Sequence, residues 1–281
     1  MTSRVFDARQ CELGEGPLWH PLRQQLFWFD ILNNKLMTKA NGVQQEWAFD
    51  EHVSALGWVD KDTFLLASET GLYRFDLVSG QRVSVAAIEA DNAVTRSNDG
   101  RADPQGGFWI GTMGKMAEEN AGAIYRYYKG EVRKLFADMT ITNSICFAPE
   151  GKLAYYCETL SRKIMKVALD AEGWPMGTPE VFVDLNAAGF SPDGSVVDAA
   201  GNLWNAQWGA HRVACYGPDG AFKQAVGFAA TQTSCPAFGG ADLSQLFVTS
   251  AVEGLEGPNE GKTYVCEMPG VTGQAEHQVI L

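Results

Sequence analysis

Acidic and amide side chains precede short apolar runs at four widely separated places in the chain. These side chains are Glu15 in "LGEGPLW", Asn98 in "TRSNDGR" with Arg96 two residues earlier, Asn143 in "TITNSICF" and Asp193 in "SPDGSVV". Two carboxylates and one or two carboxamides around a point would form an oxygen-only site of the kind that suits Ca²⁺, Mg²⁺ or Mn²⁺. Without a cation, two carboxylates crowded together would repel each other and one would keep its proton.

A repeated fold would bring these side chains together. Short apolar runs alternate with Gly, Asp, Asn and Pro clusters, which indicates β-strands. A unit of strand, turn, strand, loop and strand recurs six times with no linker between copies, and its period of about 40–50 residues is typical of four-stranded propeller blades. We therefore predict an all-β, six-bladed β-propeller that forms a single domain over residues 1–281. The pattern alone leaves a large β-sandwich or two β domains as alternatives.

In a propeller, the first strand of each blade lines the central channel, so residues at the start of these strands converge on one mouth of it. Glu15, Asn98, Asn143 and Asp193 occupy such positions in the first, third, fourth and fifth copies. The repeat therefore predicts that all four side chains face the channel axis. Taken alone, Asp193 would be only a turn residue in "PDG", and "NDG" would be only a hairpin signal.

Composition and charge exclude several classes of function. The net charge of −12 argues against binding to nucleic acid or to an anionic membrane surface. No apolar run reaches the roughly 18 residues of a membrane span, and the first residues lack the apolar core of a signal peptide. We therefore expect a cytoplasmic protein, and a monomer because a propeller is closed. The six cysteines lack a C-x-x-C pair and the four histidines are dispersed, which favours buried reduced thiols over disulfides or a zinc cluster.

The motifs resemble those of one known family over nearly the whole chain. "GEGPLW", "RSNDGRADPQGGFWIGTM", "ITNSICFAPEGKLAYY", "SPDGSVVDAAGNLW" and "TSCPAFGG" are similar to the gluconolactonase and regucalcin (senescence marker protein) family. The resemblance implies a propeller that binds one divalent metal and hydrolyses sugar lactones. It assigns Glu15, Asn143 and Asp193 as metal ligands, and Arg96 and Asn98 as substrate contacts. The implied metal is calcium or zinc, with manganese, magnesium or iron(II) as alternatives.

The sequence departs from the family pattern at three places. Ser144 stands where a glycine often follows the ligand Asn, and Asn205 interrupts the usual apolar run as "LWNA". In the loop "GKMAEEN", neither Glu118 nor Glu119 aligns with the glutamate that contacts sugar in animal members. These departures bear on sugar specificity more than on the metal. The role of Trp208, near a predicted loop, stays open.

Lactone hydrolysis needs a polarised carbonyl, an activated water and a stabilised oxyanion. The resemblance implies that the metal polarises the lactone, and we hypothesise that Asp193 accepts the proton of the attacking water as general base. Arg96 and Asn98 would hydrogen-bond the carbonyl and the sugar hydroxyls. The predicted reaction converts an aldonolactone to its aldonic acid in oxidative sugar catabolism. The alternatives are a phosphotriesterase-like hydrolase and a non-catalytic calcium-binding propeller; G-x-S-x-G, the signature of serine esterases, is absent.

Overall fold

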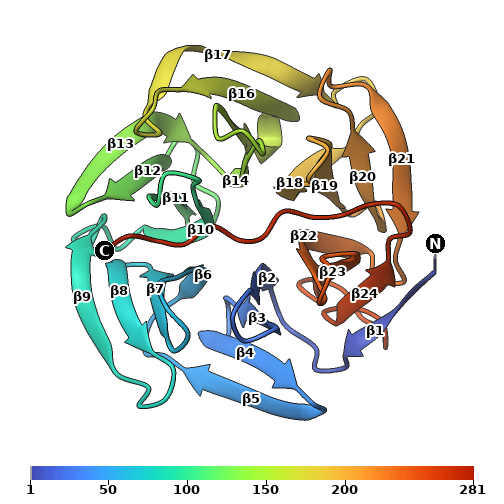
Figure 1. Ribbon diagram of the computed structural model, residues 1–281, viewed down its shortest axis with the longest axis horizontal. Coiled ribbons are helices and arrows are strands. Elements are labelled where there is room, and N and C mark those ends of the chain that lie inside the picture. Colours follow the sequence, from blue (N-terminus) through green and yellow to red (C-terminus); the bar gives the residue numbers. More distant parts are fainter. Residues whose placement is uncertain (1) are drawn as a thin grey trace.

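The chain folds into six four-stranded antiparallel sheets arranged around a central axis (Figure 1). The computed structural model describes residues 2–281. Its strands follow the sequence order blade by blade, which confirms the predicted six-bladed β-propeller. The only helix of the described residues is the short 3₁₀ helix η1 (Thr159–Ser161).

The first three blades each consist of four consecutive strands. Blade 1 comprises β2 (Gly14–His20), β3 (Gln25–Asp30), β4 (Lys35–Ala40) and β5 (Val43–Ala48). Blade 2 comprises β6 (Val53–Trp58), β7 (Thr63–Ser68), β8 (Gly71–Asp76) and β9 (Arg82–Ala87). Blade 3 comprises β10 (Thr95–Ala102), β11 (Phe108–Gly114), β12 (Gly122–Tyr128) and β13 (Glu131–Met139).

The next two blades repeat this plan, and the last one differs. Blade 4 comprises β14 (Thr142–Phe147), β15 (Leu153–Glu158), β16 (Lys163–Leu169) and β17 (Pro175–Asp184). Blade 5 comprises β18 (Ser191–Val197), β19 (Leu203–Trp208), β20 (Arg212–Tyr216) and β21 (Phe222–Gly227). Blade 6 comprises β22 (Gln232–Gly239), β23 (Gln245–Ala251), β24 (Thr263–Glu267) and, as its outermost strand, β1 (Ser3–Asp7).

The two ends of the chain meet in blade 6. Strand β1 pairs antiparallel with β24, with Arg4 opposite Val265. This strand precedes the first copy of the repeat read from the sequence, so the repeat did not assign it to a blade. The pairing covers the edge that β24 would otherwise expose and joins the two ends of the ring.

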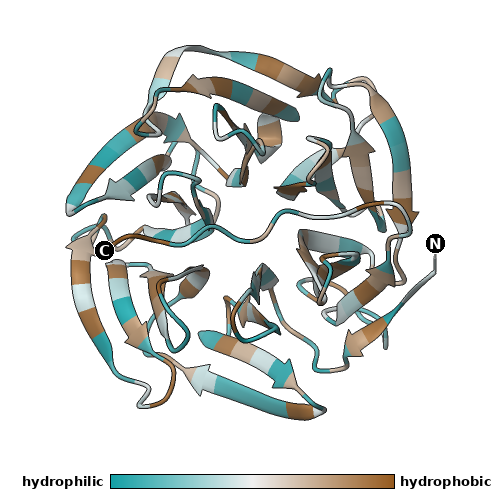
Figure 2. Ribbon diagram, in the orientation of Figure 1, coloured by the Kyte–Doolittle hydropathy of each residue, from teal (hydrophilic) through white to brown (hydrophobic). Residues whose placement is uncertain are grey.

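The hydrophobic core lies between neighbouring sheets. Trp28, Trp109 and Trp204 are fully buried there. All six cysteines are buried and unpaired, as predicted. Along the outermost strands, for example β9, hydrophobic and hydrophilic residues alternate because one face meets a blade and the other meets solvent (Figure 2).

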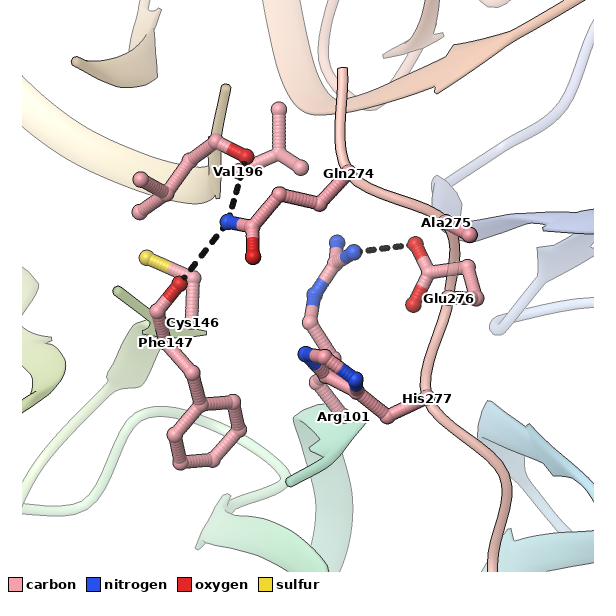
Figure 3. A pocket seen from close by; sticks show the side chains of 9 residues that line it. Arg101, Cys146, Phe147, Val196, Gln274, Ala275, Glu276 and His277 are labelled. Carbon is pink, nitrogen blue, oxygen red and sulfur yellow. Dashed lines mark hydrogen bonds and ion pairs between the residues drawn. The ribbon is translucent and has the colours of Figure 1, made fainter. Parts of the chain in front are cut away.

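The C-terminal strap, residues 272–281, crosses the axis at one end of the channel (Figure 1). Gln274 Nε2 donates to the carbonyls of Phe147, 3.1 Å away in blade 4, and Val197, 2.9 Å away in blade 5. Glu276 forms an ion pair with Arg101 of blade 3, and both side chains are almost completely buried. Figure 3 shows the Gln274 amide pointing toward blades 4 and 5 and the Glu276 carboxylate pointing toward Arg101, beside a cavity of about 20 Å³ that has room for one water.

Candidate active site

The innermost strand of every blade loses its regular pairing near one mouth of the channel. In β2, register shifts between Glu15 and Leu18, and in β14 it shifts between Asn143 and Cys146. The same irregularity occurs between Ser97 and Gly100 in β10, between Pro192 and Ser195 in β18, and in β6 and β22. Such bulges re-aim side chains that a regular strand would direct into the sheet.

The predicted site residues therefore lie inside the first strands, near their beginning, rather than before them. Glu15, Asn98, Asn143 and Asp193 are members of β2, β10, β14 and β18. "SPDG" and "NDG" are parts of these irregular strands, so the turn and hairpin readings of the two motifs are wrong.

One pocket of about 390 Å³ brings all five predicted site residues together. Glu15, Arg96, Asn98, Asn143 and Asp193 all line it, and each is at least nine-tenths buried. The strap's partners, by contrast, lie toward the other end of the same strands: Arg101 follows Asn98 in β10, and Val197 follows Asp193 in β18. The pocket and the strap therefore occupy opposite ends of the channel.

In the protein alone, burial and mutual repulsion disfavour the ionised forms of the two carboxyl groups. Burial, together with the charge of Asp99, raises the pKa of Glu15 to about 8. Burial and the charge of Glu15 raise the pKa of Asp193 well above its ordinary value. Arg96 opposes both shifts, but burial lowers its own pKa to about 10. A cation placed between the two carboxylates would relieve this repulsion.

Neighbouring groups orient the amide of Asn143. Its Nδ2 donates to Thr159 Oγ1 at 2.9 Å, and that hydroxyl donates to the carbonyl of Pro192, also at 2.9 Å. Its Oδ1 accepts from Asn98 Nδ2 at 3.2 Å and keeps a second lone pair. Thr159, which sequence reasoning did not select, thus orients the amide of Asn143 and links it to the residue before Asp193.

The residue after each of two predicted ligands has a left-handed backbone. Gly16 follows Glu15 with φ of +53°, and Ser144 follows Asn143 with φ of +60°. A β-carbon on Gly16 would lie 2.2 Å from the backbone oxygen of Ser54 in blade 2, so only glycine fits there. Ser144 has no such clash, but an L-residue pays about 1–2 kcal/mol for this conformation.

Hydrogen bonds explain why a serine occupies the strained position 144. Its Oγ donates to the carbonyl of Asp193 at 2.5 Å and accepts from Ser195 Oγ at 3.0 Å. Asn205 Nδ2 donates to the same Asp193 carbonyl at 3.1 Å and to Ser195 Oγ at 3.1 Å. The two departures from the family pattern, Ser144 and Asn205, therefore belong to one buried network that holds the backbone of Asp193.

Arg96 and Asn98 act as a pair. Arg96 Nη1 donates to Asn98 Oδ1 at 2.8 Å and to the carbonyl of Ser97 at 2.9 Å. Asn98 Nδ2 is shared between the carbonyl of Thr142 and Asn143 Oδ1. Arg96 Nη2 forms no hydrogen bond within residues 2–281, so it is the donor that this pair leaves available to a ligand in the pocket.

Further residues complete the pocket wall. Trp208 lines it, which places this side chain beside the site, and so do Lys115 and Glu253. Glu118 does not line it; its carboxylate accepts instead from the backbone nitrogen of Met116. Lys115 and Glu253 lie in loops outside the strand repeat, so the repeat that located the other residues could not locate them.

The donor set fits a hard divalent cation. Glu15, Asn143 and Asp193 line the same pocket, and the two carboxylates lack a compensating positive charge of equal size. In residues 2–281, no group of three or more His, Cys, Asp or Glu side chains is placed to bind a metal, so the candidate ligands here are two carboxylates and one amide. Their ligand atoms are all oxygen, which suits calcium, magnesium or manganese better than a sulfur or imidazole site would.

Comparison with known proteins gives matches over most of the chain. Residues 13–252 match a family model described as "SMP-30/Gluconolactonase/LRE-like region". A Rhizobium meliloti protein provisionally named a sugar lactone lactonase is 39% identical, over 94% of this chain and 92% of its own. The L-arabinolactonase of Azospirillum brasilense is 35% identical, over 94% and 90% of the two chains.

A solved structure has nearly the same fold. The calcium-binding protein regucalcin from Agrobacterium tumefaciens is 41% identical, covers 100% of this chain and 98% of its own, and superposes with a TM-score of 0.97. These matches confirm the resemblance inferred from the motifs. Because lactonases hydrolyse ester bonds, the names of the relatives also bear out the prediction of an ester hydrolase.

Proposed function

Because the chain belongs to the SMP-30/gluconolactonase/LRE-like family, we propose that it is a metal-dependent sugar lactonase that hydrolyses an aldonolactone to the aldonic acid. One observation carries the proposal. Glu15, Asn143 and Asp193 line one pocket together with Arg96. A carbonyl group bound there would meet both a cation site and a hydrogen-bond donor.

Glu15, Asn143 and Asp193 would hold the metal. The raised pKa values of the two carboxylates support this assignment, since a divalent cation would supply the charge that keeps them ionised. Calcium is the first choice, because the ligand atoms are all oxygen and the regucalcin relative is named a calcium-binding protein. When bound, a divalent metal supplies Lewis acidity toward the lactone carbonyl and lowers the pKa of water.

The protein's own groups perform the remaining steps. Asp193 accepts the proton of the attacking water and returns it to the ring oxygen when the bond between this oxygen and the carbonyl carbon breaks. The Ser144–Asn205 network holds the backbone of Asp193 during both transfers. Arg96 Nη2 donates to the lactone carbonyl oxygen and stabilises the negative charge that develops there. Asn98 Oδ1, which keeps one lone pair after accepting from Arg96, accepts a hydrogen bond from a sugar hydroxyl.

Proton release on addition of aldonolactones tests the proposal. The assay compares chelated protein, protein with each divalent metal restored, and Asp193→Asn, which keeps the side-chain volume but removes the base. Asp91→Asn, at an exposed position, is the matched control and should retain full activity. Metal-dependent turnover that is lost only in Asp193→Asn is the expected result. Metal binding with no lactone turnover would refute catalysis and leave the calcium-binding or phosphotriesterase alternatives.

A further inference from the structure

Lys115 places a positive charge on the pocket wall that the proposed reaction does not use. It follows β11 in blade 3, and its backbone nitrogen donates to the carbonyl of Val94 at 2.8 Å. This bond anchors the loop at its beginning. The side chain lines the pocket and is 32% exposed, so it faces the open part of the pocket rather than the core.

Glu69 of the neighbouring blade binds the Lys115 side chain, and His52 binds Glu69 in turn. Glu69, directly after β7, accepts from Lys115 Nζ with Oε1 at 3.2 Å and contacts His52 Nδ1 with Oε2 at 2.5 Å. Backbone bonding between Glu69 and His52 fixes the pair, since Glu69 N donates to His52 O at 3.0 Å. Burial acts against the charge of Glu69, but hydrogen bonds from His52 and Lys115 outweigh it and lower the pKa of Glu69. The carboxylate thus stays ionised as an anchor.

The ammonium group keeps unused hydrogen-bonding capacity. A lysine ammonium has three N–H donors, and within residues 2–281 the Lys115 ammonium donates only to Glu69. Met113, in β11, and Met116, in the loop that follows, are apolar and also line the pocket. Because these neighbours cannot accept a hydrogen bond well, the remaining N–H donors of Lys115 are available to an oxygen atom of a bound ligand.

We propose that Lys115 is a specificity-determining residue that donates a hydrogen bond to a sugar hydroxyl remote from the lactone carbonyl. Glu69 is the positioning residue that aims it. The inference rests on the proposed lactonase function and narrows its substrate class to neutral, polyhydroxylated lactones. A neutral substrate is favoured over an anionic one because Glu69 already balances the charge of Lys115.

The contacts of Lys115 argue against a merely structural role. Its ion pair is partly exposed to solvent, and such pairs contribute little to stability. Lys115→Met keeps the apolar length of the side chain and removes its donors, so the variant should fold normally. Metal affinity should also be unchanged, since Lys115 is not among the proposed ligands.

The experiment measures kcat and KM on the best aldonolactone of the panel and on analogues that each lack one hydroxyl. Lys115→Met should lower kcat/KM for the full lactone about 10- to 100-fold, mainly through KM, because a hydrogen bond from a charged donor is lost. For one deoxy analogue the loss should nearly vanish, and this analogue identifies the hydroxyl that Lys115 contacts. Glu69→Gln should produce a smaller loss with the same dependence on that hydroxyl. Lys152→Met, at an exposed position outside the pocket, is the matched control.

Two failures are distinguishable. If the unmodified protein hydrolyses none of the lactones, the proposed function and this inference are both overturned. If it is active but Lys115→Met loses the same factor on every analogue, or loses nothing, the specificity role alone is refuted.

Discussion

Substitutions at Ser144 can separate two contributions to the free energy of unfolding: the strain of a left-handed backbone and the hydrogen bonds of the side chain. The perturbation is a pair of substitutions, Ser144→Ala and Ser144→Gly. Both remove the Oγ that donates to the Asp193 carbonyl and accepts from Ser195. Only the glycine variant also relieves the left-handed backbone, whose φ is +60°.

The expected magnitudes follow from these contacts. Loss of a buried hydroxyl that bonds two partners costs about 1.5 kcal/mol, and the Asp193 carbonyl keeps its bond from Asn205. The left-handed conformation costs alanine about 1–2 kcal/mol, while glycine adds about 0.4–1 kcal/mol of backbone entropy to the unfolded chain. Ser144→Ala should therefore lower the free energy of unfolding by about 1.5 kcal/mol, and Ser144→Gly should recover about 0.5–1 kcal/mol of that loss.

Equilibrium urea denaturation of the two variants and the unmodified protein measures their free energies of unfolding, and the alanine variant should have the lowest value. Calcium titration of the same samples gives a second readout, in which the two variants should weaken binding equally because both release the backbone of Asp193. If the alanine variant is as stable as the glycine variant, the argument from backbone strain is wrong. If neither weakens calcium binding, the network does not support the proposed ligand.

Three further predictions concern the site and the strap. Gly16→Ala should lower the free energy of unfolding by more than about 3 kcal/mol, because its β-carbon would meet a backbone oxygen at 2.2 Å; Gly42→Ala, which also has positive φ but no neighbour within 4 Å, should cost only about 1 kcal/mol in the same denaturation experiment. In metal-free protein, the pKa of Glu15 is raised from 4.5 to about 8, so the stability present below pH 4.5 should be lost as pH rises through 8; thermal melts at several pH values should show this loss, and a Glu15→Gln variant with an unchanged slope would contradict it. Glu276→Ala should destabilise the fold by about 3 kcal/mol in urea, because it leaves the buried guanidinium of Arg101 without its ion-pair partner; a cost under 1 kcal/mol would mean that solvent reaches Arg101.

The repeat in the sequence was sufficient to predict the blades and the convergence of distant side chains. Glu15, Asn143 and Asp193 could be located because each occupies the same position in its own copy of the repeat. In a propeller, equivalent positions of the innermost strands lie close together around the axis. Strand β1 could not be assigned, because five residues without a motif do not indicate which sheet edge they cover.

The remaining features depend on contacts between blades. Ser144 and Asn205 looked like separate departures from a pattern, and only the three-dimensional structure shows that both bind the carbonyl of Asp193. Lys115 follows a strand in a loop without periodicity, and its anchor Glu69 lies 46 positions earlier in another blade. Contacts between residues of different blades are not visible in local composition, so the sequence did not predict them.

The strap across the far end of the channel determines how substrate enters and product leaves. Gln274 and Glu276 bind groups from three blades there, and the space that remains beside them holds about one water. A sugar-sized molecule can therefore enter only through the mouth of the channel that holds the pocket, and the product must leave through the same opening. Substrate and product cannot occupy the pocket together, so the aldonic acid should act as a competitive inhibitor of the lactone. A saccharide too long to fit within the pocket should not be hydrolysed.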